Sequence, residues 1–365
     1  MFIDISIYKA QVCTIKYTYT FLKFAFWSLS LLYSTGSISG AGSGDLFRSD
    51  EIIHLELRSD FTAIQIDRTG NPQYNDGELI YYVPGGETLR FTVRIIARGN
   101  FRRMPENCSF PPLFINFKKK EVNNTIFDGQ DKLKLVMPCQ DEADVIEEYT
   151  VCKMYNRVTD LSFRVRLAKI LYYDTSIGKK LFESYSYFIE DKDHVAEMNN
   201  CYEYIKFMTP FDLDKENYMK LSFFQYIIGN EDSFVVSRKN IVALQPDDSS
   251  LSPYAIPFDF DFSGFVNADY SKPKDIPEEL MRNRRSYKGI CYTNDELEEV
   301  FDFFRKLRPE LKSVIINQKP LSRKERKYIL TYIRYFYNII GNKSLIKKEF
   351  IDICEKKRDY NIIDE

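Results

Sequence analysis

The sequence predicts an α+β fold in which the first half is a twisted sheet with one helix and the second half is mainly helical. Residues 51–138 contain short runs rich in β-branched and aromatic residues, separated by Gly, Pro, Asn and Asp turn signals. Residues 144–158 are predicted to form a helix, and a hairpin follows it. After about residue 192, apolar residues recur at helical spacing behind capping residues. We therefore expect a β-rich N-terminal lobe at 45–191, a helical C-terminal lobe at 192–365 and a ligand cleft between them.

The helical half has recognisable start and stop signals. One predicted helix ends at Gly229, and a second begins with a capping box at Thr293 and stops before Pro309. A third runs from the capping box at Ser322 to Gly341. Its apolar stripe is interpreted as core rather than as a partner-binding face, and it consists of Ile329, Ile333, Phe336 and Ile340.

The N-terminus has the order of a secretory signal. Lys16 and Lys23 precede an apolar run at 24–33, and small residues follow at 34–44. This order predicts a signal peptide and linker at 1–44, cleavage between about 34 and 44, and export to the periplasm, the cell surface or the medium. A buried N-terminal helix and a misassigned start are the alternatives. The apolar run is too short to span a bilayer well, so no stable membrane span is expected after cleavage.

The composition limits the kinds of partner and metal site that can be expected. The formal net charge is −2, which gives no reason to expect a nucleic-acid partner. The only histidines are His54 and His194, which argues against a His-rich metal site. The seven cysteines include no C-x-x-C pattern, so a zinc site has no support. Cys108 and Cys139 lie at strand edges and are the expected disulfide pair of an exported chain, with free buried thiols as the alternative.

Two short stretches carry aspartates into apolar surroundings. The first aspartate stretch, "IGNEDSFVVSRKN" at 228–240, holds Asp232 and Asn240. The second, "IPFDFDFSG" at 256–264, alternates phenylalanines with Asp259 and Asp261. Two carboxylates on one face of a strand are costly without a cation. Carboxylate and amide oxygens suit Mg²⁺, and Arg284 or Arg285 is the alternative partner for the aspartates.

These stretches resemble the catalytic region of CotH-type (spore coat protein H) atypical kinases. "RIIARGNF" at 94–101 and "YSYFIED" at 185–191 resemble further strands of that family, and the match covers roughly residues 90–265 in order. The whole chain also resembles a family of uncharacterised exported proteins of the Bacteroides type. The first resemblance implies a two-lobed protein-kinase-like fold. It also implies phosphoryl transfer from ATP, with Mg²⁺ or Mn²⁺, to an unknown hydroxyl-bearing protein or glycan.

The resemblance assigns roles to the four polar residues of the aspartate stretches. Asp232 would be the base that takes the hydroxyl proton. Asn240 and Asp259 would hold Mg²⁺, with Asp261 as a second metal or structural carboxylate. The spacing from Asp232 to Asn240 is eight residues, longer than in most protein kinases.

The nucleotide contacts would come from the first half of the chain. Arg98 and Asn100 would lie on the phosphate side, and Glu190 would border the adenine. The phosphate-binding lysine is expected to be Lys134 in "KLKLV", paired with Glu148 on the following helix. No strong Gly-rich phosphate loop is present.

Two other functions remain open. The chain could be an exported pseudokinase that serves as a binding or scaffold module. It could also be a glycosyltransferase, because D-x-D binds Mn²⁺ with a nucleotide sugar. The order of strands first and helices second argues against the glycosyltransferase.

Overall fold

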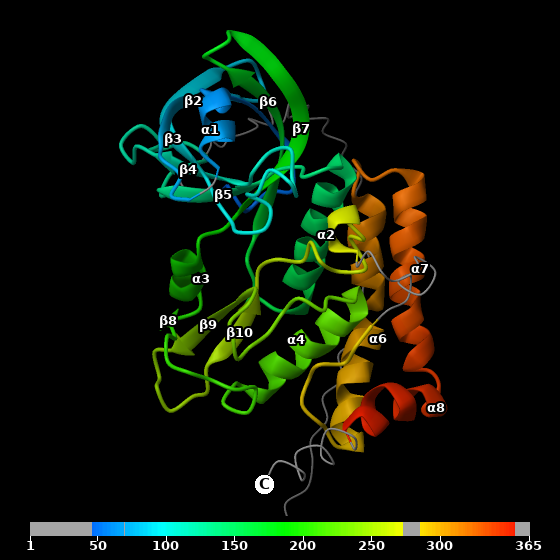
Figure 1. Cartoon of the computed structure of the whole chain (residues 1–365). Helices are drawn as coiled ribbons and strands as arrows, with labels where there is room; N and C mark the ends of the chain where they lie inside the picture. The colour runs from blue at the N-terminus through cyan, green and yellow to red at the C-terminus, as the bar shows by residue number, and fades with distance from the viewer. Residues whose placement is uncertain (1–45, 69, 273–284, 355–365) are drawn as a thin grey trace, which may run out of the picture. The chain divides into compact units, whose positions relative to one another are not determined.

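Seven strands in the first half of the chain close into a barrel (Figure 1). The computed structural model describes residues 46–68, 70–272 and 285–354. The barrel order is β1-β2-β3-β4-β5-β7-β6. Its strands are β1 (Ile53–Ser59), β2 (Asn75–Tyr82), β3 (Thr88–Ala97), β4 (Leu113–Phe117), β5 (Lys132–Val136), β6 (Val165–Asp174) and β7 (Lys179–Ile189). A short helix, α1 (Phe61–Ile66), follows β1.

The barrel closes because its first strand pairs with a strand far along the chain. β1 runs parallel to β6, with Ile53 opposite Ala168, whereas every other pairing in the barrel is antiparallel. Along β3, Phe91, Val93 and Ile95 are buried and the residues between them are exposed or half-buried. This period of two turns one face of each strand into the barrel and explains why the strands could be recognised from the sequence.

The prediction of a two-lobed protein-kinase-like fold with a helical C-terminal lobe is wrong. The sheet is a closed mixed barrel rather than an open lobe. The later half also contains a three-stranded antiparallel sheet in the order β10-β9-β8, formed by β8 (Cys201–Glu203), β9 (Ile241–Pro246) and β10 (Tyr254–Pro257). Local periodicity shows that strands exist, but closure depends on the long-range β1–β6 pairing, which leaves no local signal.

Helices cover one side of the second sheet and continue away from the barrel (Figure 1). They are α2 (Glu142–Val158), α3 (Lys192–Met198), α4 (Lys215–Ile228), α6 (Asn294–Asn317), α7 (Arg323–Ile339) and α8 (Lys343–Ile346), with short turns η1 (Asp269–Ser271) and η2 (Lys347–Ile351). One apolar core joins α2 and the ends of β5, β6 and β7 to α4, α6 and α7, and a second core fills the barrel. Thus α2, from the first half of the chain, shares its core with the later helices.

Most predicted helix signals are confirmed. Gly229 caps α4, and capping boxes open α6 at Thr293 and α7 at Ser322. The predicted stop before Pro309 is wrong, because α6 continues through it to Asn317. An interior proline loses a hydrogen bond, but burial of the flanking Leu307 and Leu311 favours continuation. The α7 stripe is core as predicted: Ile329, Ile333, Phe336 and Ile340 are all buried.

Two disulfides lie within the described residues. The predicted Cys108–Cys139 bond is confirmed, and a second bond joins Cys291 to Cys354. No helix among the described residues has the length and apolarity needed to cross a membrane. The predicted signal peptide lies outside the described residues, so export stays a prediction.

We predict that Gly229→Ala destabilises the protein and that Gly341→Ala does not. Gly229 caps α4 with a φ of 63° in the left-handed region, where a Cβ costs about 1–2 kcal/mol. Gly341 follows α7 without a positive φ. Urea denaturation should show the loss of unfolding free energy for Gly229→Ala alone. Equal losses in both variants would contradict this interpretation of the cap.

Candidate functional site

The two aspartate stretches lie side by side. The second stretch begins at the end of β10, where the Phe258 N–H donates to the Asn240 carbonyl oxygen at 3.3 Å. The Asn230 side-chain nitrogen lies 3.5 Å from the Asp259 carbonyl oxygen, and Asn230 forms an isolated bridge with Ser263. Backbone contacts therefore hold the loop of the first stretch against the segment that carries the carboxylates of the second.

Asp232 is held by its own loop. Its N–H donates to Asn230 Oδ1 at 2.9 Å, and its carboxylate forms an ion pair with Lys239. Asn240 Nδ2 donates to Asp232 Oδ2 at 3.1 Å, from a left-handed backbone conformation that asparagine tolerates well. No described residue donates to the side-chain oxygen of Asn240, which leaves that oxygen for another partner.

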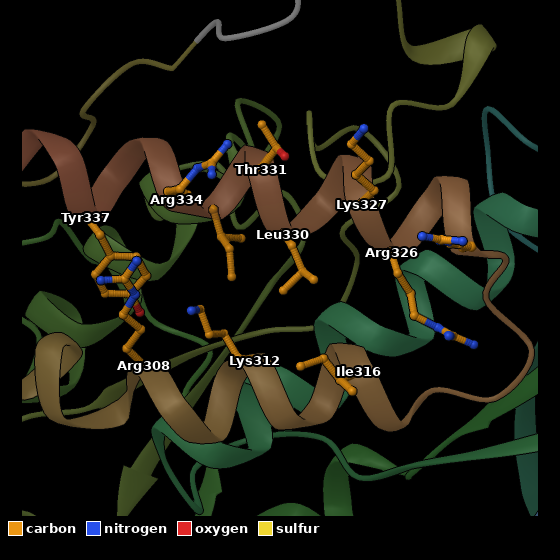
Figure 2. Close-up of a pocket in the computed structure, with 11 residues that line it drawn as sticks. Arg308, Lys312, Ile316, Arg326, Lys327, Leu330, Thr331, Arg334 and Tyr337 are labelled. Atoms are coloured by element: carbon orange, nitrogen blue, oxygen red, sulfur yellow. The ribbon is translucent and has the colours of Figure 1, made fainter.

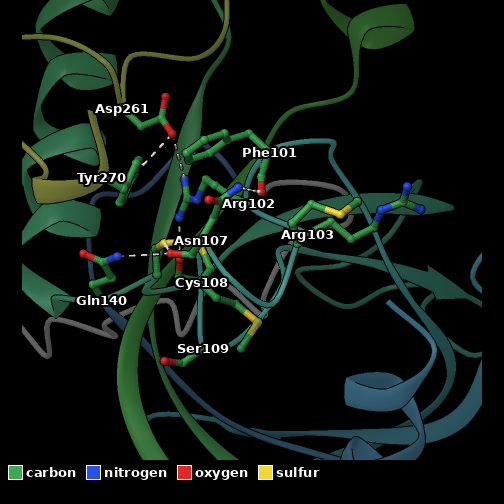
Figure 3. The surroundings of a disulfide bond; sticks show 12 residues. Phe101, Arg102, Arg103, Asn107, Cys108, Ser109, Gln140, Asp261 and Tyr270 are labelled. Atoms are coloured by element: carbon green, nitrogen blue, oxygen red, sulfur yellow. Dashed lines mark hydrogen bonds and ion pairs between the residues drawn. A yellow bond between two sulfur atoms is a disulfide. The ribbon is translucent and has the colours of Figure 1, made fainter. Parts of the chain in front are cut away.

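A buried ion network joins the loop after β3, helix α2 and the second aspartate stretch. Figure 3 shows the contacts of Arg102 and Tyr270 with Asp261. Arg102 Nη1 lies 3.3 Å from Glu148 Oε2 on α2 and 3.8 Å from Asp261 Oδ2. Arg102 Nη2 donates to the Met137 carbonyl oxygen at 2.6 Å. The Tyr270 hydroxyl donates to Asp261 Oδ2 at 3.2 Å. One guanidinium thus compensates two carboxylates that are almost inaccessible to solvent.

The loop that carries Arg102 is fixed from two sides. The Cys108–Cys139 bond joins this loop, which follows β3, to the segment between β5 and α2. The buried Arg68 side chain donates to the Cys108 carbonyl oxygen at 2.7 Å and to that of Arg103 at 2.8 Å. These restraints reduce the conformational freedom of the loop and hold Arg102 near its two carboxylates.

Burial raises the pKa of both network carboxyls. Burial and the neighbouring Asp259 raise the pKa of Glu148 to about 7, and Arg102 opposes the rise. Burial, followed by Asp259 and Glu148, raises the pKa of Asp261 well above its usual range. Arg102 therefore offsets only part of the cost of burying two negative charges.

Two further cations, Lys134 and Arg98, interact electrostatically with Asp259 and form no ion pair with a described residue. Lys134 Nζ lies 5.0 Å from the centre of the Phe258 ring and has no hydrogen bond or ion pair with a described residue. Burial and the nearby Arg98 lower the pKa of Lys134 to about 8, and Asp259 partly offsets them. Burial also lowers the pKa of Arg98, and its buried Nε has no partner among the described residues. An incoming anion would relieve both groups.

The predicted ion pair between Lys134 and Glu148 is not formed. Arg102 takes the position of the lysine as the partner of Glu148. Lys134 instead lies against aromatic rings, with its ammonium free of described carboxylates. The helix is the one predicted, but an arginine from the loop after β3 reaches the glutamate in place of the lysine on β5.

The structure brings together only some of the residues that were expected near the nucleotide. Glu190, at the end of β7, is buried and accepts from Arg164 Nε at 3.0 Å and from the Arg164 N–H at 2.9 Å. His194 Nδ1 lies 2.8 Å from the same carboxylate. The Glu190 carboxylate is therefore already engaged by Arg164 and His194. Asn100 is exposed in the loop after β3.

Few of the described side chains in the site could serve as ligands of a metal ion. Among the described residues, no group of three or more His, Cys, Asp or Glu side chains is arranged to hold one. Asp261 is engaged by Arg102 and Tyr270. The Asp259 carboxylate receives a long contact of 3.4 Å from the Asp261 N–H and shares a hydrogen bond with the Asp261 side chain. Asp259 and the Asn240 oxygen fit Mg²⁺, which commonly takes one or two protein ligands together with substrate phosphates.

Sequence reasoning missed the arginine that pairs with the second stretch. Arg285 donates to the carbonyl oxygens of Tyr226 and Tyr332, and Arg284 lies outside the described residues. Arg102 fills the role instead. Nothing in the sequence distinguishes it from the neighbouring Arg98 and Arg103.

Neither a family model nor a curated protein matches this chain. The resemblance to CotH-type kinases therefore stays a prediction that rests on its short motifs, and the interpretation of the site depends on its residues and geometry.

We predict that Arg102→Met destabilises the protein by about 3–5 kcal/mol, because it leaves Glu148 and Asp261 buried without their cation. Both carboxyls have raised pKa values in the folded state. The folded protein therefore binds more protons than the unfolded chain above the ordinary carboxyl pKa, and stability falls as pH rises. The variant should lose more stability at about pH 8 than at about pH 5.

The neighbouring Arg103 supplies the control. Its side chain donates to the Gly70 carbonyl oxygen and has no ion pair with a described carboxylate. Chemical denaturation of Arg103→Met should show a small loss that does not depend on pH. A pH-independent loss in Arg102→Met would show that the network does not depend on this guanidinium.

Proposed function

We propose that this protein binds a nucleoside triphosphate with Mg²⁺ and transfers its terminal phosphoryl group to a hydroxyl of a protein or glycan. The main support is one observation: Lys134 and Arg98, two half-buried cations without an ion pair to a described residue, interact electrostatically with Asp259. Anion-binding and metal-binding groups are thus next to each other, as phosphoryl transfer requires.

The cations on the phosphate side of the proposed site have no carboxylate among the described residues paired with them. Burial lowers the pKa of both Lys134 and Arg98, and the nearby Arg98 lowers that of Lys134 further. A phosphate placed between them would regain hydrogen bonds and charge compensation that water provides elsewhere. Arg102 does not take part, because Glu148 and Asp261 already engage it.

The metal side uses Asp259 and Asn240. A bound Mg²⁺ would neutralise phosphate charge during transfer. Asp259 would supply the carboxylate, and Asn240 the side-chain oxygen that its contacts with Asp232 leave available. Asp261 would support Asp259 from behind, as part of the Arg102 network.

The hydroxyl side uses Asp232. Its carboxylate is oriented by Asn240 and compensated by Lys239. In the proposed reaction, Asp232 accepts the proton of the attacking hydroxyl, whose oxygen forms the new bond to phosphorus. The bond from phosphorus to the bridging oxygen breaks, and the nucleoside diphosphate leaves with that electron pair.

A nucleotide-dependent binding module without transfer is the second candidate. The ion pair between Asp232 and Lys239 favours it, since a paired carboxylate is a weaker base. This candidate shares the nucleotide site and differs only in the fate of the phosphoryl group.

Lys134→Met should abolish binding of a non-hydrolysable ATP analogue with Mg²⁺, as measured by isothermal titration. The exposed Lys132 on the same strand provides the matched control, and Lys132→Met should bind normally. In the wild type, affinity should fall as pH rises above about 8, by up to about tenfold per unit, because the free lysine loses its proton there. Lys134→Arg should remove this pH dependence. Equal binding by both methionine variants would refute the phosphate site.

Asp259→Asn and Asp232→Asn should separate binding from chemistry. The first should remove the Mg²⁺ dependence of analogue binding, because a neutral amide compensates the metal charge poorly. The second should bind the analogue and slow phosphate transfer by about 10²–10⁴-fold, the usual contribution of a general base. Wild-type protein that binds the analogue without transferring phosphate to itself or to added acceptors would support the binding module. Absence of both would reject the proposed function.

A further inference from the structure

A cationic groove lies between α6 and α7, away from the residues of the proposed phosphoryl-transfer site (Figure 2). Its cavity has a volume of about 550 Å³. Six of the side chains that line it are cationic: Arg308, Lys312, Arg323, Arg326, Lys327 and Arg334. No Asp or Glu is among the lining residues, and no described carboxylate forms an ion pair with these six.

The floor of the groove is apolar. Figure 2 shows Arg308 and Lys312 directed from α6 towards α7, and Leu330 and Tyr337 directed back from α7. Ile316, on the same helix as Lys312, is 55% exposed although it is a large apolar residue. The Arg308 guanidinium lies 4.4 Å from the centre of the Tyr337 ring. This arrangement gives a ligand both an apolar surface and charged hydrogen-bond donors.

Two of the guanidinium groups have unmet hydrogen-bond donors. The buried Nε atoms of Arg308 and Arg326 have no partner among the described residues. Arg326 uses only one of its terminal nitrogens, which donates to the Lys319 carbonyl oxygen at 3.3 Å. A buried donor without a partner is unfavourable, and an oxyanion in the groove would satisfy it.

The placement of these charges is unfavourable without a ligand. Arg323 and Arg326 lie in the first turn of α7, at the positive end of the helix dipole, where anions are preferred. The six cations also repel one another, in a chain whose formal net charge is −2. An anion with several charges would offset both effects.

We infer that this groove binds a ligand that carries two or more phosphate groups on a small carbon framework. Four of the six cations are arginines, whose planar guanidinium groups bind phosphate in a bidentate manner. Several phosphates are needed because the cations come from both helices. The apolar floor accommodates the carbon framework, which is either free in solution or part of a phospholipid headgroup. This inference does not depend on the proposed phosphoryl transfer.

The test uses the full chain and two probes. Inositol hexakisphosphate is titrated calorimetrically, and vesicles of phosphatidylcholine with or without cardiolipin, whose headgroup carries two phosphates, are used in co-sedimentation. The double variant Lys312→Gln/Arg326→Gln should weaken binding about tenfold or more, since the loss of even one charge-assisted hydrogen bond costs about that factor. The matched control, Lys306→Gln/Lys343→Gln, removes the same charge from exposed positions outside the groove and should bind as the wild type does.

Each outcome bears on the inference. Binding of the soluble probe that the groove variant loses supports a soluble phosphate ligand. Binding of the cardiolipin vesicles that the groove variant loses supports a headgroup. Failure of the wild type to bind either probe overturns the inference, and so does equal weakening in the control variant, which would indicate a general charge effect. Thermal unfolding of all variants establishes that a loss of binding is not a loss of fold.

Discussion

The arrangement of the candidate site depends on one buried guanidinium. Arg102 lies between Glu148 on α2 and Asp261 after β10, and it also binds the backbone at Met137. Each carboxylate would be strongly unfavourable in its buried position without a cation. A single side chain therefore sets the relative positions of the barrel, α2 and the second aspartate stretch, and it leaves Lys134 and Asp259 free to meet a ligand.

The local structure could be predicted from the sequence to a large extent, because it arises from local patterns. The strands of the barrel alternate buried and exposed residues, and the helices begin at Thr293 and Ser322 with capping boxes that need only four residues to recognise. The error at Pro309 shows the limit of such rules, since tertiary burial of Leu307 and Leu311 outweighs the local preference. The fold class was predicted incorrectly because barrel closure is a long-range event.

In the candidate site, too, the features set by local sequence order were predictable and those set by long-range contacts were not. The closeness of the two aspartate stretches was expected from their order, and the structure joins them through Asn230 and Asn240. The choice of partner for each charge was not predictable. Arginine has a longer reach and more donors than lysine, so Arg102 engages Glu148 from a loop although Lys134 is on the strand next to it. Spacing in the sequence gives no information on which of two cations reaches a buried acid.

The parallel pairing of β1 with β6 affects how the chain folds during its synthesis. During synthesis, β1 has only β2 as a neighbour until residues 165–174 have emerged. Its other edge is a row of unpaired backbone groups, which invites pairing with other chains. Contacts that join such distant residues also form slowly, because the intervening chain must be ordered first. The nascent barrel therefore remains open, and prone to aggregation, until its last strand, β7, has been translated.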